Sequence, residues 1–485
     1  MGFSASLWFT GAEVGLSLAG LVLLLVTAWT NHSSARLITI LAVTALFGAA
    51  IFTGVALWDT SPAAESFGGL YRVDAFGSFT KVLIYLATIA CLIVTPKFFA
   101  ERDAYRGEYP VLMLFSAIGA GMMVSATDLM TLYIGLELSS LSSYIFASFL
   151  KNDWRSNEAG LKYFILGALA SGIILYGMSL VYGFAGTTSY AGIRVAFDAA
   201  FETGALFGMV FVLAGLAFKI AAVPFHMWTP DVYEGAPTPV TAFFASAPKV
   251  AAVGMLMRIA FGPFGGEAEA WRQIAIFASL ASIVVGALGA IGQQSLKRLM
   301  AYSSINNIGF LLIGIACATP AGASAAAQYM AIYVPMTLGS FVAILMLRDA
   351  DGNPLETFAD ISGLAVTRKG LAWCLAALMF SLAGIPPLFG FWAKFVVFQA
   401  AVEADLVALA AIGIAASVIG AFYYLKFIKV MFFDDSIRAP EANSPAGHWA
   451  VLAICVLAVS PLAYLATPWL DAVADRAAAA LFFVA

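Results

Sequence analysis

Apolar runs of about twenty residues recur along nearly the whole chain, separated by short polar segments. A run of this length spans the hydrocarbon core of a bilayer as a helix. Only 11% of the residues are charged, against about 25% in soluble domains, and no polar stretch is long enough to form such a domain. The chain is therefore predicted to be an all-α polytopic membrane protein.

Hydropathy indicates about fourteen transmembrane spans. The predicted spans are 6–30, 35–58, 76–96, 109–126, 128–150, 159–184, 203–223, 237–262, 270–292, 298–318, 323–347, 370–400, 404–432 and 446–468. The seventh and twelfth apolar segments continue through prolines, over 204–229 and 370–402, and each exceeds one crossing. Both are therefore predicted to be discontinuous helices, numbers 7 and 12 of the series.

The basic residues of the loops are divided unequally between the two sides of the membrane. With the N-terminus outside, thirteen lie on the inner side: Arg36, Lys97, Arg102, Arg106, Lys151, Arg155, Lys297, Arg298, Arg348, Arg368, Lys369, Lys429 and Arg438. Four lie on the outer side: Arg72, Arg194, Arg272 and Arg476. Because basic loops stay on the cytoplasmic side, both termini are predicted to face outward.

Lys219 is the most informative single residue. It lies in an apolar run, five residues before Pro224. An ionisable residue inside a membrane helix costs about 2.5 kcal/mol or more and marks an ion or proton path by default. Pro224 removes a backbone hydrogen bond and clashes with the carbonyl of Ile220, so the helix is expected to break beside the charge. A charge at a helix break is typical of ion carriers.

A second lysine near a proline break indicates an internal duplication. Lys394 follows Pro386-Pro387 in the twelfth span. Spans four to eight and spans nine to thirteen are therefore two groups of five, and in each group the fourth span is a broken helix that carries a lysine. Because five is an odd number, the two units are predicted to be inverted repeats, a common transporter plan. The predicted units are an N-terminal three-helix segment over 1–108, the first repeat over 109–262, the second over 263–432, and a C-terminal helix and tail over 433–485.

Glu137 lies about three turns into the fifth span, near the bilayer centre. It is either a structural carboxylate paired with a buried cation or part of a proton switch, and the second interpretation is favoured. Lys219 is its natural partner, although the sequence does not establish contact. Pairing would hold the lysine charged, whereas separation would let burial favour the neutral amine.

Four further residues are candidates for the same path. Lys249 and Lys394 lie inside spans, and a role in function is favoured over a structural one. Lys162 lies about one turn into the sixth span, where a lysine can also extend to the membrane interface. His226 follows the first helix break. It suits proton relay near neutral pH, or it could cap carbonyls that the break leaves free.

The sequence shows no motif for a redox cofactor, a metal or a nucleotide. The four cysteines have no paired spacing, the three histidines are not spaced for haem, and there is no phosphate-binding glycine loop. The net charge of −4 gives no indication of nucleic-acid binding. We therefore expect this chain to bind no cofactor.

Several motifs together resemble one known family. They are Gly135-Leu136-Glu137-Leu138, Glu158-Ala159-Gly160-Leu161-Lys162-Tyr163-Phe164, Phe218-Lys219-Ile220-Ala221-Ala222-Val223-Pro224-Phe225-His226-Met227-Trp228 and Pro230-Asp231-Val232-Tyr233-Glu234-Gly235-Ala236-Pro237-Thr238-Pro239-Val240. Over nearly its whole length the chain resembles the antiporter-like membrane subunits of respiratory complex I and the related multisubunit cation/proton antiporters. Ala247-Pro248-Lys249 and Gly384-Ile385-Pro386-Pro387 look most like the subunit N branch, as does the absence of a long C-terminal lateral helix.

The resemblance implies that Glu137, Lys162, Lys219, Lys249 and Lys394 form a proton path. It implies a proton-translocating subunit of a bacterial NADH:quinone oxidoreductase in the inner membrane, with both termini on the periplasmic side. FMN, iron–sulfur clusters and quinone would then be bound by other subunits. Expected partners are neighbouring antiporter-like subunits, small membrane subunits and lipid. Two alternatives stay open: a subunit of a Na⁺/H⁺ antiporter or membrane-bound hydrogenase, and a non-pumping scaffold subunit.

Overall fold

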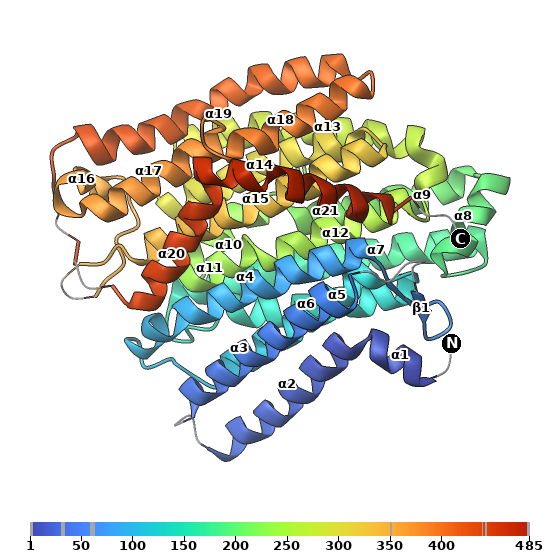
Figure 1. The fold of residues 1–485 in the computed structure, drawn as a ribbon, viewed down its shortest axis with the longest axis horizontal. Coiled ribbons are helices and arrows are strands. Elements are labelled where there is room, and N and C mark those ends of the chain that lie inside the picture. The colour runs from blue at the N-terminus through green and yellow to red at the C-terminus, as the bar shows by residue number, and fades with distance from the viewer. Residues whose placement is uncertain are drawn as a thin grey trace.

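Long helices lying side by side make up nearly all of the structure, which is a computed structural model (Figure 1). It describes residues 3–30, 34–58, 64–349, 352–438, 440–441 and 444–482. The helices of the first half are α1 (Phe3–Phe9), α2 (Gly11–Trp29), α3 (Ala35–Ile51), a π-helical extension (Phe52–Ala56), α4 (Ala75–Ala100), α5 (Glu108–Ser125), α6 (Leu129–Ala147), α7 (Trp154–Ala185), α8 (Tyr190–Ala199), α9 (Thr203–Ile220), α10 (Trp228–Gly235), α11 (Thr238–Phe244) and α12 (Ala247–Phe261).

The second half continues the bundle. Its helices are α13 (Ala268–Ile291), α14 (Leu296–Ala316), α15 (Pro320–Leu345), α16 (Leu364–Thr367), α17 (Lys369–Ala383), α18 (Gly390–Glu403), α19 (Val407–Phe433), α20 (Ala446–Val459) and α21 (Thr467–Ala479), with 3-10 turns at Gly265–Glu267, Ala359–Ile361 and Pro461–Ala466. Within the described ranges, twelve helices are long and apolar enough to cross a membrane, or up to fourteen if two bent pairs are counted as spans. The prediction of an all-α polytopic fold is confirmed.

Polar side chains fix where several spans begin. Asp74 precedes α4 and accepts a hydrogen bond from the amide of Gly77 at 2.7 Å. Asp128 does the same for α6, and Asp153 for α7. A side-chain acceptor at this position satisfies one of the amides that have no partner within the helix. Each of these aspartates therefore marks the first turn of a span.

The prediction that spans 7 and 12 are discontinuous is confirmed. The helix α9 ends at Ile220 and α10 begins at Trp228, while α17 ends at Ala383 and α18 begins at Gly390. At the first break the amide of Ala222 donates to the carbonyl of Ala217, and at the second the amide of Ile385 donates to the carbonyl of Phe380. Both bonds have the six-to-one spacing of a Schellman motif, which closes a helix with a left-handed residue.

The fourteenth span differs from its prediction as one straight helix over 446–468. The helix α20 ends at Val459, and the segment from Pro461 to Ala479 is bent away from it by 63°. A proline disfavours helical backbone at the residue before it, here Ser460. The helix α21 then packs against α15 and α4.

A small β-hairpin also lies outside the all-helical expectation. Strands β1 (Ala64–Ser66) and β2 (Tyr71–Val73) pair antiparallel, with Glu65 opposite Arg72. Figure 1 shows the hairpin at the same end of the bundle as both chain ends and α8, which we call the hairpin end. The opposite end carries α16 and the α4–α5 connection, and we call it the basic end.

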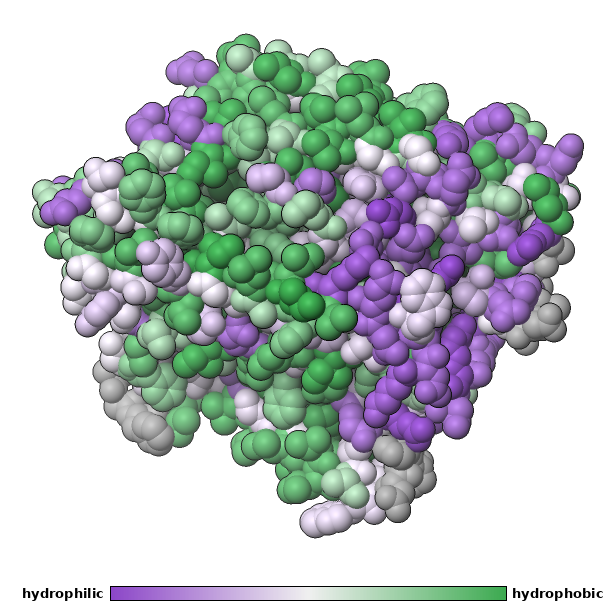
Figure 2. Space-filling view, turned by 180° about the vertical axis from the view of Figure 1, so that it is seen from behind, coloured by the Kyte–Doolittle hydropathy of each residue, from purple (hydrophilic) through white to green (hydrophobic). Residues whose placement is uncertain are grey.

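The centre of the bundle is formed by α11–α12, α14 and α15. Their most apolar windows are 94%, 94% and 89% buried, whereas those of α2, α7, α13 and α19 are 33% to 39% buried. The outer helices therefore expose apolar side chains around the bundle. Figure 2 shows this hydrophobic surface together with a hydrophilic band toward one end of that face.

Candidate functional site

Lys219 lies in the last turn of α9, immediately before the first helix break. Its Nζ atom donates to Ser140 Oγ at 2.9 Å and to the Tyr144 hydroxyl at 3.4 Å, both on α6. The C-terminal end of a helix carries partial negative charge, which favours the ammonium form here. Lys219 is thus held against α6 by neutral groups.

Glu137 lies on α6 one turn before Ser140. Among the described residues no carboxylate lies within 4 Å of Lys219 Nζ, so Glu137 on α6 and Lys219 on α9 do not form an ion pair. The Oε1 atom of Glu137 is buried and has no hydrogen-bond partner in the described part of the chain. Glu137 is therefore near enough to Lys219 to act on its charge, but the two side chains are not paired.

Glu137 also borders an outward-facing stripe of α6. Along that face lie Met130, Ile134, Leu141 and Ile145, which are four, seven and four residues apart, and all four are exposed. Glu137 falls between Ile134 and Leu141 and is half-buried. A carboxylate beside an exposed apolar stripe indicates a surface that another protein covers, since membrane carboxylates face protein or water.

Lys249 lies at the third residue of α12, in the centre of the bundle. It is 2% exposed, and its Nζ atom donates to the hydroxyl of Ser304, which is 2.7 Å from the hydroxyl of Tyr333. The described residues place no carboxylate within ion-pair distance of it. The N-terminal end of a helix carries partial positive charge, so this position disfavours the ammonium form.

A polar network continues from Lys249 along α14. Ser304 is followed on that helix by Asn307, whose side-chain amide donates to the Tyr424 hydroxyl at 3.2 Å and whose carbonyl accepts from the Tyr329 hydroxyl at 2.7 Å. Phe310 comes one turn later. These positions share one helix face. The network joins α14, α15 and α19 at the centre of the molecule.

Lys394, on α18, lies at the Phe310 end of this face of α14. Its Nζ atom is 4.5 Å from the centre of the Phe310 ring and donates to the carbonyl of Ala383 at 2.8 Å and to Ser417 Oγ at 3.2 Å. Ala383 is the last residue of α17, so the lysine satisfies a carbonyl that the break leaves free. Lys394 comes after its break, whereas Lys219 comes before its own.

Lys162 belongs to a different cluster. Its side chain is 42% exposed and forms ion pairs at 2.8 Å with both Glu158 and Asp231. Arg298 binds Asp231 at 2.6 Å and Glu234 at 3.1 Å. A cavity of about 310 Å³ opens beside these side chains. Lys162 therefore lies in a solvated ion-pair cluster rather than among the buried lysines.

His226 lies just past the first break, where other groups satisfy much of the freed backbone. The indole nitrogen of Trp228 donates to the carbonyl of Phe218 at 2.9 Å, and the amide of Val223 donates to Ser282 Oγ at 2.9 Å. The Nδ1 atom of His226 is buried and has no partner among the described side chains and backbone groups.

Two buried ion pairs near the hairpin end were not anticipated. Lys81 Nζ on α4 lies 2.6 Å from Glu13 Oε1 on α2, and Arg258 on α12 contacts Asp74. The signal was present, because Lys81 and Arg258 both lie inside predicted spans, as Lys249 does. An ionisable residue within a span is a functional candidate wherever it occurs.

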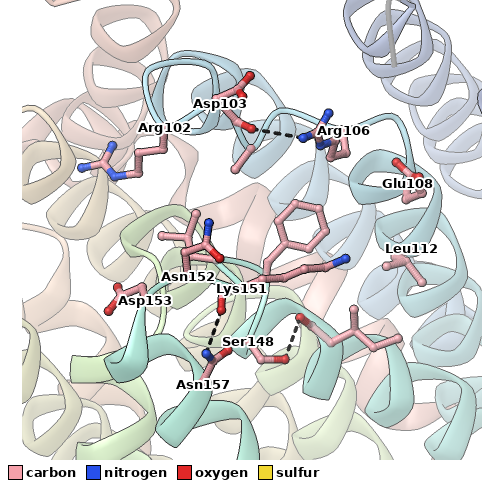
Figure 3. Close-up of a pocket in the computed structure, with 14 residues that line it drawn as sticks. Arg102, Asp103, Arg106, Glu108, Leu112, Ser148, Lys151, Asn152, Asp153 and Asn157 are labelled. Carbon is pink, nitrogen blue, oxygen red and sulfur yellow. Dashed lines mark hydrogen bonds between the residues drawn. The ribbon is translucent and has the colours of Figure 1, made fainter. Parts of the chain in front are cut away.

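A large polar cavity at the basic end is separate from these residues (Figure 3). It has a volume of about 970 Å³ and lies between the α4–α5 and α6–α7 connections. Its charged lining residues are of both signs: Arg102, Arg106, Lys151, Asp103, Glu108 and Asp153. None of the predicted relay residues lines it.

The family model for the NADH:quinone oxidoreductase/Mrp antiporter transmembrane region matches residues 126–420. The chain is 62% identical to NADH-quinone oxidoreductase subunit N of Erythrobacter litoralis over 99% of each chain. The subunit N of Rhizorhabdus wittichii is 57% identical, over 99% of this chain and all of that one. The chain belongs to the NADH-quinone oxidoreductase subunit N family. It is thus a multi-pass bacterial membrane protein and a subunit of a proton-translocating oxidoreductase.

Solved structures agree on the fold. A chain of respiratory complex I from Thermus thermophilus matches with a TM-score of 0.79 and 28% identity, over 94% of this chain and 98% of that chain. A chain of the Mrp complex from Dietzia sp. matches with a TM-score of 0.82 and 24% identity, over 99% and 98%. The fold is therefore shared between different kinds of complex. The full-length identity to subunit N relatives is what assigns this chain to one family.

Proposed function

We propose that this subunit carries protons across the membrane through Glu137, Lys219, Lys249 and Lys394, with Lys162 at the basic end. The electron transfer from NADH to quinone takes place in other subunits, which hold the FMN, the iron–sulfur clusters and the quinone. A charge displacement that reaches Glu137 changes its interaction with Lys219. The proton then moves through Lys249 to Lys394 and leaves outward.

One observation carries the proposal: three membrane lysines have no carboxylate partner among the described residues. Lys219, Lys249 and Lys394 donate only to hydroxyl groups and, for Lys394, to a backbone carbonyl. A buried ammonium ion is costly without a counter-ion, whereas a neutral amine is not. Such lysines can release and take up a proton at a small difference in free energy, which a relay requires.

The position of each lysine relative to its helix supports a direction of transfer. The C-terminal end of α9 favours a charged Lys219, and the N-terminal end of α12 disfavours a charged Lys249. A proton that reaches Lys249 is therefore at higher free energy than one on Lys219. Moving one charge against 100 mV costs about 2.3 kcal/mol, so the relay must be driven from outside this chain.

The half-buried Glu137 supports a neighbouring membrane subunit on the α6 face. The exposed stripe of α6 continues past Glu137 to Ile145, which also lines the polar cavity at the basic end. We propose that other membrane subunits of the complex cover this face, and that lipid covers the remaining apolar surface. We also propose that the hairpin end faces the periplasm, because the basic loops lie at the opposite end.

The proposal is tested by replacing Lys249 in the assembled complex. Lys249→Met keeps the length of the side chain and removes the titratable group, and Lys249→Arg keeps the charge but does not release a proton. Both variants are expected to reduce NADH-driven proton uptake by membrane vesicles at least about tenfold, the effect of 1.4 kcal/mol on a rate. A blot for the assembled complex normalises the rates.

Lys429→Met is the matched control. Lys429 is 65% exposed and is paired with Asp434 at 3.0 Å. Its replacement should leave proton uptake per assembled complex unchanged. Wild-type uptake by an assembled Lys249→Met complex would reject the relay and favour a scaffold role.

A further inference from the structure

The N-terminal helices contain a second buried acid–base site that the relay does not use. Glu13 lies in the first turn of α2 and Lys81 in the second turn of α4, with Glu13 Oε1 at 2.6 Å from Lys81 Nζ. Both residues are buried, at 6% and 3% exposure. Lys81 also donates to the hydroxyl of Tyr71 in the hairpin. The site thus joins two membrane helices to the hairpin end.

Several polar atoms around this pair are unsatisfied. Glu13 Oε2, the Tyr85 hydroxyl and Ser125 Oγ are buried and have no hydrogen-bond partner in the described part of the chain. Buried polar groups are normally hydrogen-bonded, through water where protein atoms do not serve. The cluster is therefore chemically suited to hold water between its hydroxyl and carboxylate groups.

Gly121 on α5 keeps room for these groups. A Cβ atom at this position would lie 3.0 Å from Glu13 Oε1 and 3.1 Å from the Tyr85 hydroxyl. Burial, followed by the Glu13 carboxylate, holds the pKa of Tyr71 well above its usual range. The Tyr71 hydroxyl therefore stays protonated and can both accept from Lys81 and donate.

A line of buried polar residues leads from the pair into the membrane along α4. Lys81, Tyr85, Thr88 and Cys91 recur at spacings of four, three and three residues, which places them on one helix face. The line covers about 15 Å, at 1.5 Å per residue. At its inner end Cys91 Sγ is 3.9 Å from the hydroxyl of Ser246, which precedes α12 and lies three residues before Lys249.

The neighbouring ion pair of Asp74 and Arg258 is built differently. Arg258 binds both oxygens of Asp74 and donates to the carbonyl of Val124 at 2.8 and 3.0 Å. Asp74 also caps α4, and Arg72 lies 3.7 Å from it. This pair is fully hydrogen-bonded and anchors three elements, as a structural ion pair does.

We propose that the Glu13–Lys81 pair exchanges protons between the hairpin side of the membrane and the polar line along α4 that reaches Ser246, beside Lys249. From the ion pair, the Lys81 ammonium passes its proton to the Glu13 carboxylate, and the carboxylic acid releases that proton to water at the hairpin end. A proton that arrives along α4 then binds the neutral amine of Lys81. The pair then returns to its starting state. This inference rests on the proposed function and gives the relay a second exit.

The test uses the whole complex in membrane vesicles. Glu13→Gln with Lys81→Met removes both titratable groups and keeps side-chain volume. Asp74→Asn with Arg258→Met is the matched control, because it neutralises the other buried pair at the same end. We expect the first double variant to lower NADH-driven proton uptake per assembled complex at least fivefold and to raise its solvent deuterium isotope effect. The control should assemble in smaller amount and retain the wild-type rate per complex and isotope effect.

Tyr85→Phe keeps the proposal testable if the first double variant does not assemble. It removes one hydroxyl beside Glu13 and should slow proton uptake with a raised isotope effect. For whichever variant assembles, a wild-type rate, or a slower rate with an unchanged isotope effect, would overturn the proposal. Lys249→Met in the same vesicles separates the two ideas. Normal pumping there rejects the relay itself, whereas normal pumping only in the Glu13 and Lys81 variant rejects the second exit.

Discussion

Gly384 and Ala221 occupy the same position in the two helix breaks, yet only one of them is a glycine. Both have left-handed backbone, with φ of 79° and 63°. A Cβ atom on Gly384 would lie 2.7 Å from Cδ of Lys394, because that lysine crosses the break to the carbonyl of Ala383. Close approach of the lysine therefore accounts for the glycine at the second break.

Gly384→Ala should displace Lys394 while leaving the bundle intact. The left-handed conformation adds about 1 kcal/mol of strain, and the flexible lysine gives way before the backbone does. We expect assembled complex in near-normal amount and clearly reduced proton uptake. Gly172→Ala is the control, because a Cβ atom there meets no other atom within 4 Å. Unchanged uptake by Gly384→Ala would show that the position of Lys394 is unimportant.

The candidate residues could be identified from the sequence, but their contacts could be predicted only in part. The sequence identified Lys249 and Lys394 because a charge in an apolar run stands out, and the structure places both in the buried centre. The separation of Glu137 from Lys219 depends on how α6 and α9 are placed relative to each other, and hydropathy does not predict this placement. Lys81 and Glu13 were both detectable by the same criterion as Lys249, since both lie inside predicted spans, but their pairing depends on how α2 and α4 pack. The proton-relay role of these residues stays a prediction.

At the scale of the helix, both breaks follow from local chemistry. Pro224 prevents helix continuation beyond Ile220, as expected, and the amides and carbonyls freed there find new partners. The indole of Trp228 supplies one of them, at 2.9 Å from the carbonyl of Phe218. The broken helix is therefore held by side-chain hydrogen bonds as well as by backbone ones.

Trp228→Phe should weaken the first break. It removes the indole hydrogen bond to the carbonyl of Phe218, which then keeps only the amide of Ala221 as a donor, at a cost of about 0.5–1.5 kcal/mol. We expect the thermal midpoint for loss of this subunit from the purified complex to fall by several degrees. Trp154→Phe serves as the control, since Trp154 is exposed at 69%. Equal midpoints for the two variants would mean that the indole bond does not stabilise the break.

Other elements escaped prediction for physical reasons. The strands β1 and β2 have three residues each, too few for an alternating pattern to show. The bend after α20 is signalled by Pro461, but apolar residues continue through it and hydropathy alone reads one span. Caps such as Asp128 mark helix starts reliably because the side chain itself makes the bond.

At the scale of the whole molecule, the two ends of the bundle differ in the number of basic loop residues. The α4–α5 and α6–α7 connections carry Arg102, Arg106 and Lys151 at the basic end. The fold and the spans could be predicted almost completely, because span length is set by the bilayer. The division at 108, 262 and 432 and the inversion of the two repeats stay predictions.

Reporter fusions should reveal which end faces the cytoplasm. A reporter inserted after Asp103 or Arg368 is expected to be cytoplasmic, and one inserted in the Gly68-Gly69 turn is expected to be periplasmic. Loop charge sets this orientation. A reporter fused after the last residue should also be periplasmic. A cytoplasmic signal from that fusion would contradict the even number of spans.

The most direct test of the account is proton uptake by vesicles that contain assembled Lys219→Ala, Glu137→Gln and doubly substituted complexes. We expect Lys219→Ala to abolish or strongly reduce NADH-driven uptake, and Glu137→Gln to impair it. The double variant should be little worse than the worse single one, because residues that act as one unit are not additive. Wild-type proton uptake by an assembled Lys219→Ala complex would contradict the account.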